Sequence, residues 1–195
     1  MTSTARRPPT TWWSRSRRVS PVVSPRIDHD AWVAKKSGAG STPATVALTR
    51  AGVAFTTHAY EHDPAASSYG LEAADVLGLP HEQVFKTLLA DVDGVLVVAI
   101  VPVARKLDLK ALAAAVDGKR AAMADPAIAE RTTGYVVGGI SPLGQRRQLR
   151  TVLDDSALGF DTVYVSGGRR GFDLGLSPTD LATQTGAVTA PIARD

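Results

Sequence analysis

The sequence contains no cysteine. This absence excludes disulfide bonds, thiolate metal sites, a cysteine nucleophile and dithiol redox chemistry. The chain also has no run of about 18 apolar residues, the length that crosses a membrane. Its longest apolar run, residues 95–103, has the length of a strand. With 195 residues the chain has the usual size of one domain, so we expect a single folded unit with a substantial core.

Several signature motifs are missing as well. Residues 139–144 have the glycine spacing of a P-loop, but Gln145-Arg146 stands where the phosphate-binding lysine and the hydroxyl residue would be. The sequence has no G-x-G-x-x-G, no G-x-S-x-G and no H-E-x-x-H motif, and its four histidines lack metal-site spacing. We therefore expect neither a cofactor nor a metal ion.

The positive charge of the chain is concentrated near the N-terminus. The formal net charge is +3 and the sequence pI is about 9.4. Residues 1–40 contain eight basic and two acidic residues, a net charge of +6, whereas residues 41–195 contain 14 basic and 17 acidic residues, a net charge of −3. We expect residues 1–40 to be a disordered or misassigned leader and residues 41–195 to be the functional domain. The charge of that domain alone predicts no polyanionic partner.

Apolar periodicity and turn residues predict interleaved helices and strands in residues 41–195. We expect helices at 43–51, 71–79, 108–116, 125–131 and 179–185, and strands at 53–60, 85–92, 95–103, 151–153, 162–165 and 172–176. Asp93-Gly94 between two apolar runs is a strong hairpin signal. Tight hairpins favour a mixed α/β sheet over a purely parallel one.

Three segments carry side chains or backbone groups suited to chemistry. Residues 134–144 are glycine-rich, and exposed N–H groups in such a loop can hold a carbonyl or an oxyanion, although a tight turn is the simpler interpretation. Lys86 stands at the start of a predicted strand, where a partly desolvated ammonium would bind a phosphate or ester oxygen, unless it faces solvent. Residues 166–173 form a second glycine-rich turn, flanked by a hydroxyl and a carboxylate, or an ordinary β-turn.

A group of arginines accompanies these glycine-rich segments. A solvated surface is the default interpretation, but gathering of these arginines near both segments would suit the end of an RNA. The group consists of Arg146, Arg147, Arg150, Arg169 and Arg170.

Five motifs in order give the sequence a specific resemblance. They are residues 60–64 (YEHDP), 84–88 (VFKTL), 123–126 (MADP), 134–145 (GYVVGGISPLGQ) and 164–171 (YVSGGRRG). Together they resemble the YbaK-type Cys-tRNA(Pro) deacylases, relatives of the editing domain inserted in bacterial prolyl-tRNA synthetases. The resemblance extends over roughly residues 42–195. It implies an α/β fold with a mixed, mostly antiparallel, barrel-like sheet surrounded by helices.

The resemblance, taken with the three segments above, predicts the site residues. Lys86 is the first choice, expected at the tRNA 3′ end, and the N–H groups of Gly138 and Gly139 are expected to polarise the substrate carbonyl. The predicted catalytic residues are Lys86, Gly138, Ser166 and Asp173. The predicted substrate-binding residues are Tyr60, Thr87, Gly139, Ile140, Arg146 and Arg169.

The activity implied by this resemblance is hydrolysis in trans of the ester in mischarged Cys-tRNA(Pro), which would release cysteine and free tRNA. In this family the thiol of the substrate is thought to attack its own carbonyl, which suits a chain that has no cysteine. The implied partners are the acceptor end of tRNA(Pro) and prolyl-tRNA synthetase, in the cytoplasm and without a membrane. Two alternatives remain: a deacylase for another small amino acid such as alanine, and a non-catalytic module that binds aminoacyl-tRNA or a synthetase.

Overall fold

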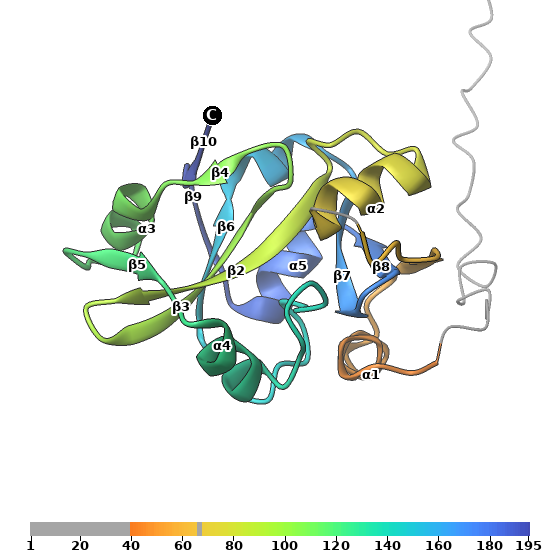
Figure 1. Cartoon of the computed structure of the whole chain (residues 1–195), viewed down its shortest axis with the longest axis horizontal. Coiled ribbons are helices and arrows are strands. Elements are labelled where there is room, and N and C mark those ends of the chain that lie inside the picture. The colour runs from red at the N-terminus through yellow and green to blue at the C-terminus, as the bar shows by residue number, and fades with distance from the viewer. Residues whose placement is uncertain (1–39, 66–67) are drawn as a thin grey trace, which may run out of the picture. The chain divides into compact units, whose positions relative to one another are not determined.

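The first two long strands of the computed structural model form the predicted hairpin (Figure 1). Strand β2 (Val84–Val92) pairs antiparallel with β3 (Val95–Pro102). Asp93 and Gly94 between them have φ values of 50° and 89°. Two successive positive φ angles are typical of the type I′ turn that joins twisted strands, so the hairpin prediction is confirmed.

The structure describes residues 40–65 and 68–195. The predicted leader, residues 1–40, lies outside these ranges except for Gly40. Within the described ranges, no helix is long and apolar enough to span a membrane.

An eight-stranded sheet is built around the hairpin. Its strand order is β1-β8-β7-β2-β3-β6-β9, and β5 pairs with β2 beside this path. The further strands are β1 (Thr56–Ala59), β5 (Ala121–Met123), β6 (Arg150–Asp154), β7 (Val163–Arg169), β8 (Phe172–Leu176) and β9 (Val188–Ala190), while β4 (Lys106–Leu107) and β10 (Ala193–Arg194) form a separate pair. The β2–β7, β3–β6 and β6–β9 pairs are parallel and the others are antiparallel. The mixed, mostly antiparallel α/β class is thus confirmed.

The helices begin and end near the predicted residues. They are α1 (Pro43–Ala51), α2 (Tyr69–Leu77), α3 (Leu109–Ala115), α4 (Pro126–Thr133) and α5 (Pro178–Thr185), with a short 3₁₀ helix, η2 (Asp155–Gly159), after β6. Side chains of Asp108, Asp125 and Ser177 accept hydrogen bonds from the free N–H groups at their helix starts. Such caps satisfy donors that the helix itself leaves unpaired, which makes these boundaries readable from sequence.

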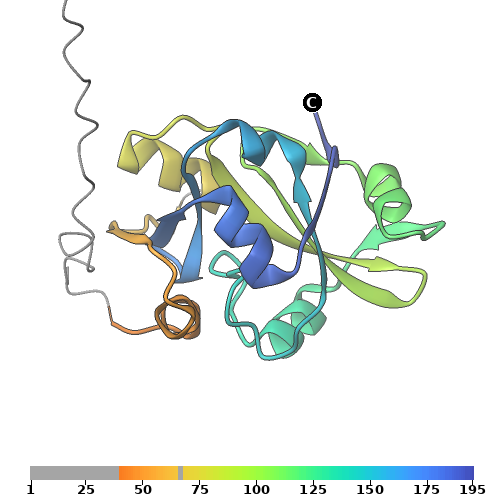
Figure 2. The same cartoon turned by 180° about the vertical axis from the view of Figure 1, so that it is seen from behind.

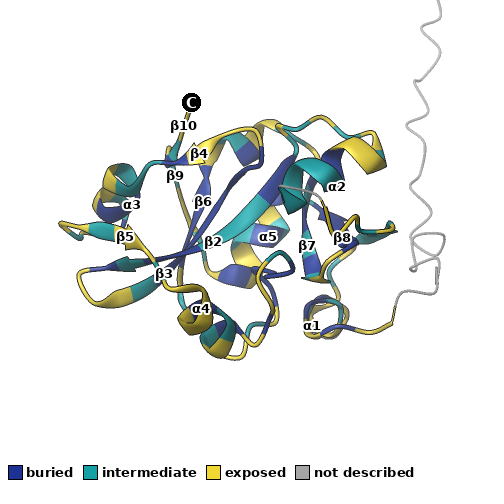
Figure 3. Cartoon of the chain, in the orientation of Figure 1, coloured by how far each residue is buried: buried dark blue, intermediate teal, exposed yellow. Residues whose placement is uncertain are grey.

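Helices cover both faces of the sheet, as Figures 1 and 2 show from opposite sides. Alternate β2 residues contribute to different cores, because successive strand side chains face opposite ways. Phe85 and Leu89 pack in the largest core with buried residues of α1, α4 and α5. On the other face, Ala90 packs with residues of α3, and Val84 packs with Ala73 and Ala74 of α2. Figure 3 shows the buried residues concentrated along these central strands.

One edge of β2 is only partly paired. Strand β3 occupies its other edge, so β7 and β5 share this one. Strand β7 pairs with residues 84–85 and β5 with residues 90–92, and among the described residues no strand pairs with 86–89 on this edge. The two neighbours therefore separate at this point, and the fold leaves space beside the middle of β2.

Candidate active site

A cavity of about 320 Å³ lies beside the unpaired part of β2. Its walls come from β2, the start of α2, α4 with the segment before it, the loop after α4, and the β7–β8 hairpin. All predicted site residues except Gly139 and Arg146 line this cavity. They are Tyr60, Lys86, Thr87, Gly138, Ile140, Ser166, Arg169 and Asp173. These predicted residues come from four separate segments of the sequence and share one pocket, of a size that small-molecule sites have.

Lys86 lines this pocket, and the residue is half-buried. Its Nζ donates to the main-chain oxygen of Val103 at 3.3 Å and to that of Arg105 at 2.5 Å. No carboxylate of the described residues lies within ion-pair distance of Lys86. Burial lowers the pKa of the Lys86 ammonium. Neutral carbonyls hold the ammonium in place, and a lysine ammonium in such a setting can bind an oxygen of a ligand.

The loop after α4 places Gly138 in the pocket through a tight turn. Gly139 N–H donates to Val136 O at 2.9 Å, and Gly138 has a φ of +87°. Among the described residues only Asp93 and Asp117 have positive φ without being glycine, so Val137 does not, and the turn is of type II. No described residue accepts a hydrogen bond from Gly138 N–H. This amide is therefore a candidate donor to a bound substrate.

Gly139 differs from the prediction. Its N–H is engaged within the turn, and the residue is buried away from the cavity lining. A Cβ at this position would lie 2.8 Å from the Cα of Arg169. Glycine is thus needed here for close packing against the β7–β8 hairpin, and not for polarising a carbonyl.

The predicted arginine group does not gather at the pocket. Among the described residues Arg169 alone of the five lines it, with its guanidinium 4.7 Å from the centre of the Phe172 ring. Arg146 lies beside Gly134, and Arg150 pairs with Asp117 at 3.2 Å. Strand β6 carries Arg150 toward the end of α3, where it donates to Val116 O, whereas Arg170 donates to Val137 O of the first glycine-rich segment.

Asp173 is a buried carboxyl in the pocket wall. It lies in β8, paired with Ser166 of β7 on one side and His58 of β1 on the other, and its residue is only 6% exposed. No hydrogen bond to its carboxylate is found among the described residues. Burial raises the pKa of Asp173 to about 7, and burial together with the charge of Asp173 raises the pKa of Tyr60. The carboxyl can accordingly be neutral or charged near neutral pH.

The hydroxyl groups of the pocket form no nucleophile–base pair. Among the described residues, Thr87 Oγ1 is the fully buried side-chain polar atom that lacks a hydrogen-bond partner. Ser166 Oγ accepts a hydrogen bond from Gly168 N–H at 3.4 Å. The nearby His58 instead bonds Thr56 Oγ1 through Nε2 at 2.8 Å. Among the described residues no base is hydrogen-bonded to Thr87 Oγ1 or Ser166 Oγ, as a base that activates a hydroxyl nucleophile would be.

Sequence reasoning missed Tyr69, which lines the pocket at the first turn of α2. Its ring is stacked close to Gly138, since a Cβ on that glycine would lie 2.7 Å from two ring carbons. The Arg170 guanidinium lies 4.8 Å from the centre of the same ring. These neighbours are far from Tyr69 in sequence, so no local pattern could indicate its role.

The described residues include no group of three or more His, Cys, Asp or Glu side chains that could hold a metal ion.

Comparison with known proteins assigns this fold and pocket to a class. Residues 63–183 match the family model of the aminoacyl-tRNA editing domain. The chain therefore belongs to the aminoacyl-tRNA editing domain family, and it is a hydrolase of aminoacyl-tRNA.

Individual relatives agree with this membership. The chain is 37% identical over 121 residues to an Enterococcus faecalis protein named "Putative Cys-tRNA(Pro)/Cys-tRNA(Cys) deacylase EbsC", a match covering 61% of this chain and 73% of that protein. A solved structure described as "a putative trans-editing enzyme for prolyl tRNA synthetase" has a TM-score of 0.70 and 26% identity, covering 80% of this chain and all of that one. The structure of a protein called APE2540 has a TM-score of 0.71 and 25% identity, covering 78% of this chain and all of that one.

Proposed function

We propose that residues 41–195 hydrolyse, in trans, the ester that links cysteine to mischarged tRNA(Pro). The observation that carries the proposal is that one pocket is lined by both Lys86 and Gly138. Among the described residues, the Lys86 ammonium has no carboxylate partner and the Gly138 amide has no acceptor. An aminoacyl ester offers matching groups, because it has a carbonyl oxygen beside the ribose and phosphate oxygens of the terminal nucleotide.

The proposed roles follow from this chemistry. Lys86 binds oxygens of the terminal nucleotide, and Gly138 N–H donates to the ester carbonyl oxygen, where negative charge develops. One such donor contributes roughly 3–4 kcal/mol to an acyl-transfer transition state. Ser166 and Asp173 contact the aminoacyl group, and Tyr60, Thr87, Ile140 and Arg169 line its surroundings. Gly139 and Arg146 have no substrate contact in this proposal.

The nucleophile in this proposal is the thiol of the substrate itself. Its sulfur forms a bond to the ester carbonyl carbon, the bond from that carbon to the ribose oxygen breaks, and the ribose oxygen takes up a proton. Water then opens the released thiolactone to cysteine. Among the described residues no base is hydrogen-bonded to Thr87 or Ser166, which supports a route that needs no hydroxyl nucleophile of the protein.

The test is deacylation of Cys-, Ala- and Ser-tRNA(Pro) in parallel. We expect cysteine to be released fastest and serine far more slowly, because a hydroxyl is the weaker nucleophile at neutral pH. Equal rates for cysteine and alanine would overturn the thiol route and favour a general small-residue deacylase. Binding in a gel shift without release of any amino acid would overturn the proposed hydrolysis.

The proposed partners are the acceptor end of tRNA(Pro) and prolyl-tRNA synthetase, and the proposed compartment is the cytoplasm, where translation takes place. The net charge of −3 on residues 41–195 supports a role for a partner, since this domain has little general attraction for RNA.

A further inference from the structure

One exposed arginine is bonded to the same peptide unit that supplies the candidate amide. Arg170 donates from Nε and Nη2 to Val137 O, at 3.1 Å and 2.8 Å. Val137 O and Gly138 N–H belong to one peptide unit, the central one of the type II turn. The peptide is planar and trans, so its C=O and N–H point in opposite directions.

This geometry gives Arg170 two effects on the Gly138 amide. By holding the carbonyl on one side with two bonds, the guanidinium fixes the direction of the N–H on the other side. By bringing a positive charge to the carbonyl oxygen, it also polarises the peptide and makes the N–H a stronger donor. Arg170 itself does not line the cavity, whereas Gly138 does.

Neighbouring contacts keep this arrangement in one position. The Arg170 guanidinium lies over the Tyr69 ring, and that ring packs against Gly138. On the far side of the turn, Val137 N–H donates to Glu130 Oε1 of α4 at 2.8 Å. The turn is therefore held from α2, α4 and the β7–β8 hairpin at once, which is the kind of support a preorganised donor requires.

We propose that Arg170 is a positioning residue of the deacylase, which aims and polarises the Gly138 N–H without touching substrate. This inference rests on the proposed function. It differs from a role in tRNA binding, where Arg170 would contact a phosphate and its loss would raise KM.

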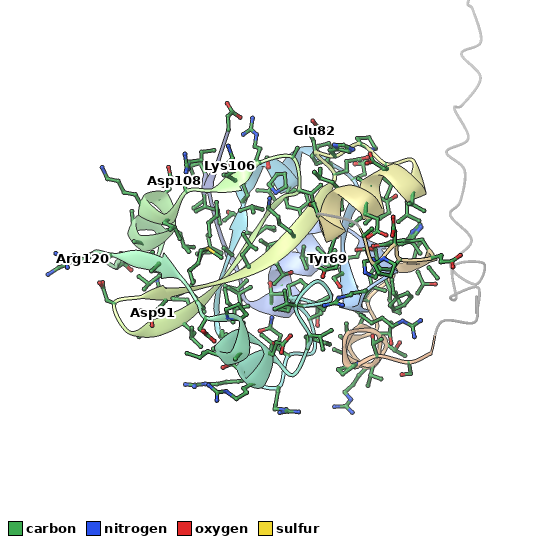
Figure 4. The ribbon with its side chains drawn as sticks, in the orientation of Figure 1. Tyr69, Glu82, Asp91, Lys106, Asp108 and Arg120 are labelled. Carbon is green, nitrogen blue, oxygen red and sulfur yellow. The ribbon has the colours of Figure 1, made fainter. Side chains whose placement is uncertain are left out.

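The test compares Arg170→Ala, Arg170→Lys and Arg120→Ala on Cys-tRNA(Pro). Arg120 is an exposed arginine at the left edge of the view in Figure 4, away from Tyr69 near the middle, and it controls for loss of one positive charge. We expect Arg170→Ala to lower kcat about 10- to 100-fold with KM changed less than about twofold, because a misaimed donor acts on the transition state. Arg170→Lys should lower kcat less, since one of the two hydrogen bonds can re-form. Guanidinium ion at a non-denaturing concentration should partly restore the kcat of Arg170→Ala.

A second readout needs no activity. In an NMR spectrum of the ¹⁵N-labelled protein, the Gly138 amide signal should move in Arg170→Ala while the Gly94 signal stays in place. An unmoved Gly138 signal, an unchanged kcat, or a rise in KM alone would each overturn the inference and leave the proposed hydrolysis standing. Absence of deacylation by the unaltered protein would overturn the proposed hydrolysis, and the inference with it.

Discussion

For Lys86, the residue and its strand can be predicted from sequence, but the contacts of its side chain cannot. A lysine at the start of an apolar strand is visible in sequence. The two carbonyls that hold its ammonium come from the segment after β3, which only the hairpin brings into contact. The lack of a carboxylate partner for Lys86 among the described residues is therefore a property of the fold, and the proposed role of this cation in substrate binding depends on it.

Removal of the Lys86 charge should abolish most of the activity. We expect Lys86→Ala and Lys86→Met to lower the deacylation rate on Cys-tRNA(Pro) by about 100-fold or more, since both lose a charged partner of the substrate. Lys86→Met retains the length of the side chain, so it separates the charge from packing. Lys106→Ala, at an exposed lysine labelled in Figure 4, is the matched control and should behave like the unaltered protein. Full activity of both Lys86 variants would refute the assignment.

Asp173 should make folding stability depend on pH in an unusual direction. An aspartate in an unfolded chain has a pKa near 3.9, whereas burial raises that of Asp173 to about 7. Between these values the folded protein binds more protons than the unfolded chain, so the contribution of this group to stability falls as pH rises from about 4 to about 7. The difference between the two pKa values corresponds to a change of at most about 4 kcal/mol in the free energy of unfolding.

Urea unfolding of Asp173→Asn across this pH range measures the effect. The variant should gain stability relative to the unaltered protein as pH rises, and the gain should level off above about pH 7. The exposed Asp161→Asn provides the control, with a profile parallel to that of the unaltered protein. A parallel profile for Asp173→Asn itself would contradict the prediction.

At the scale of elements, local signals predicted the helices and the hairpin, and missed the shortest strands. Helix ends were readable because capping residues and glycines satisfy backbone groups locally. Strands β4, β5, β9 and β10 have only two or three residues, too few for a periodic pattern. They exist because a neighbouring strand offers hydrogen bonds, as β2 does for β5. For the same reason β1 is shorter than the predicted 53–60, since only Thr56–Ala59 meets β8.

The contact between α2 and the glycine turn gives a prediction at this scale. Gly138→Ala should destabilise the protein more than Gly94→Ala and should also impair deacylation. Both glycines have φ near +90°, so both substitutions cost about 1–2 kcal/mol of backbone strain. A Cβ at Gly94 meets nothing within 4 Å, whereas one at Gly138 would lie 2.7 Å from the Tyr69 ring, which adds about 1–3 kcal/mol.

Denaturant unfolding and deacylation assays on the two variants check this prediction. Gly94→Ala lies in the β2–β3 turn and should retain activity. Equal losses of stability in the two variants would mean that Tyr69 moves aside freely and does not hold the turn.

At the scale of the whole molecule, charge predicts dependence on a partner. Residues 41–195 carry a net charge of −3, and of the five predicted arginines Arg169 alone lines the pocket in the described part of the chain. We expect prolyl-tRNA synthetase to raise deacylation of Cys-tRNA(Pro) by about tenfold or more at low tRNA concentration, because a bound partner raises the local concentration of substrate. Cysteinyl-tRNA synthetase in its place should have no such effect. Equal stimulation by both synthetases, or by neither, would contradict the prediction.

The sequence by itself determined the local elements, the family and eight residues of the pocket lining, because caps, turns and ordered motifs depend on near neighbours in the chain. Only the tertiary structure decided which of these groups are free to act. Gly138 and Gly139 look equivalent in sequence, yet the Gly138 N–H has no acceptor among the described residues and the Gly139 N–H closes a turn. Arg170 and Tyr69 gain their contacts with that turn from distant segments. Hydrogen-bond partners and burial are set by residues far apart in the chain, so free donors and raised pKa values emerge only when the chain is folded.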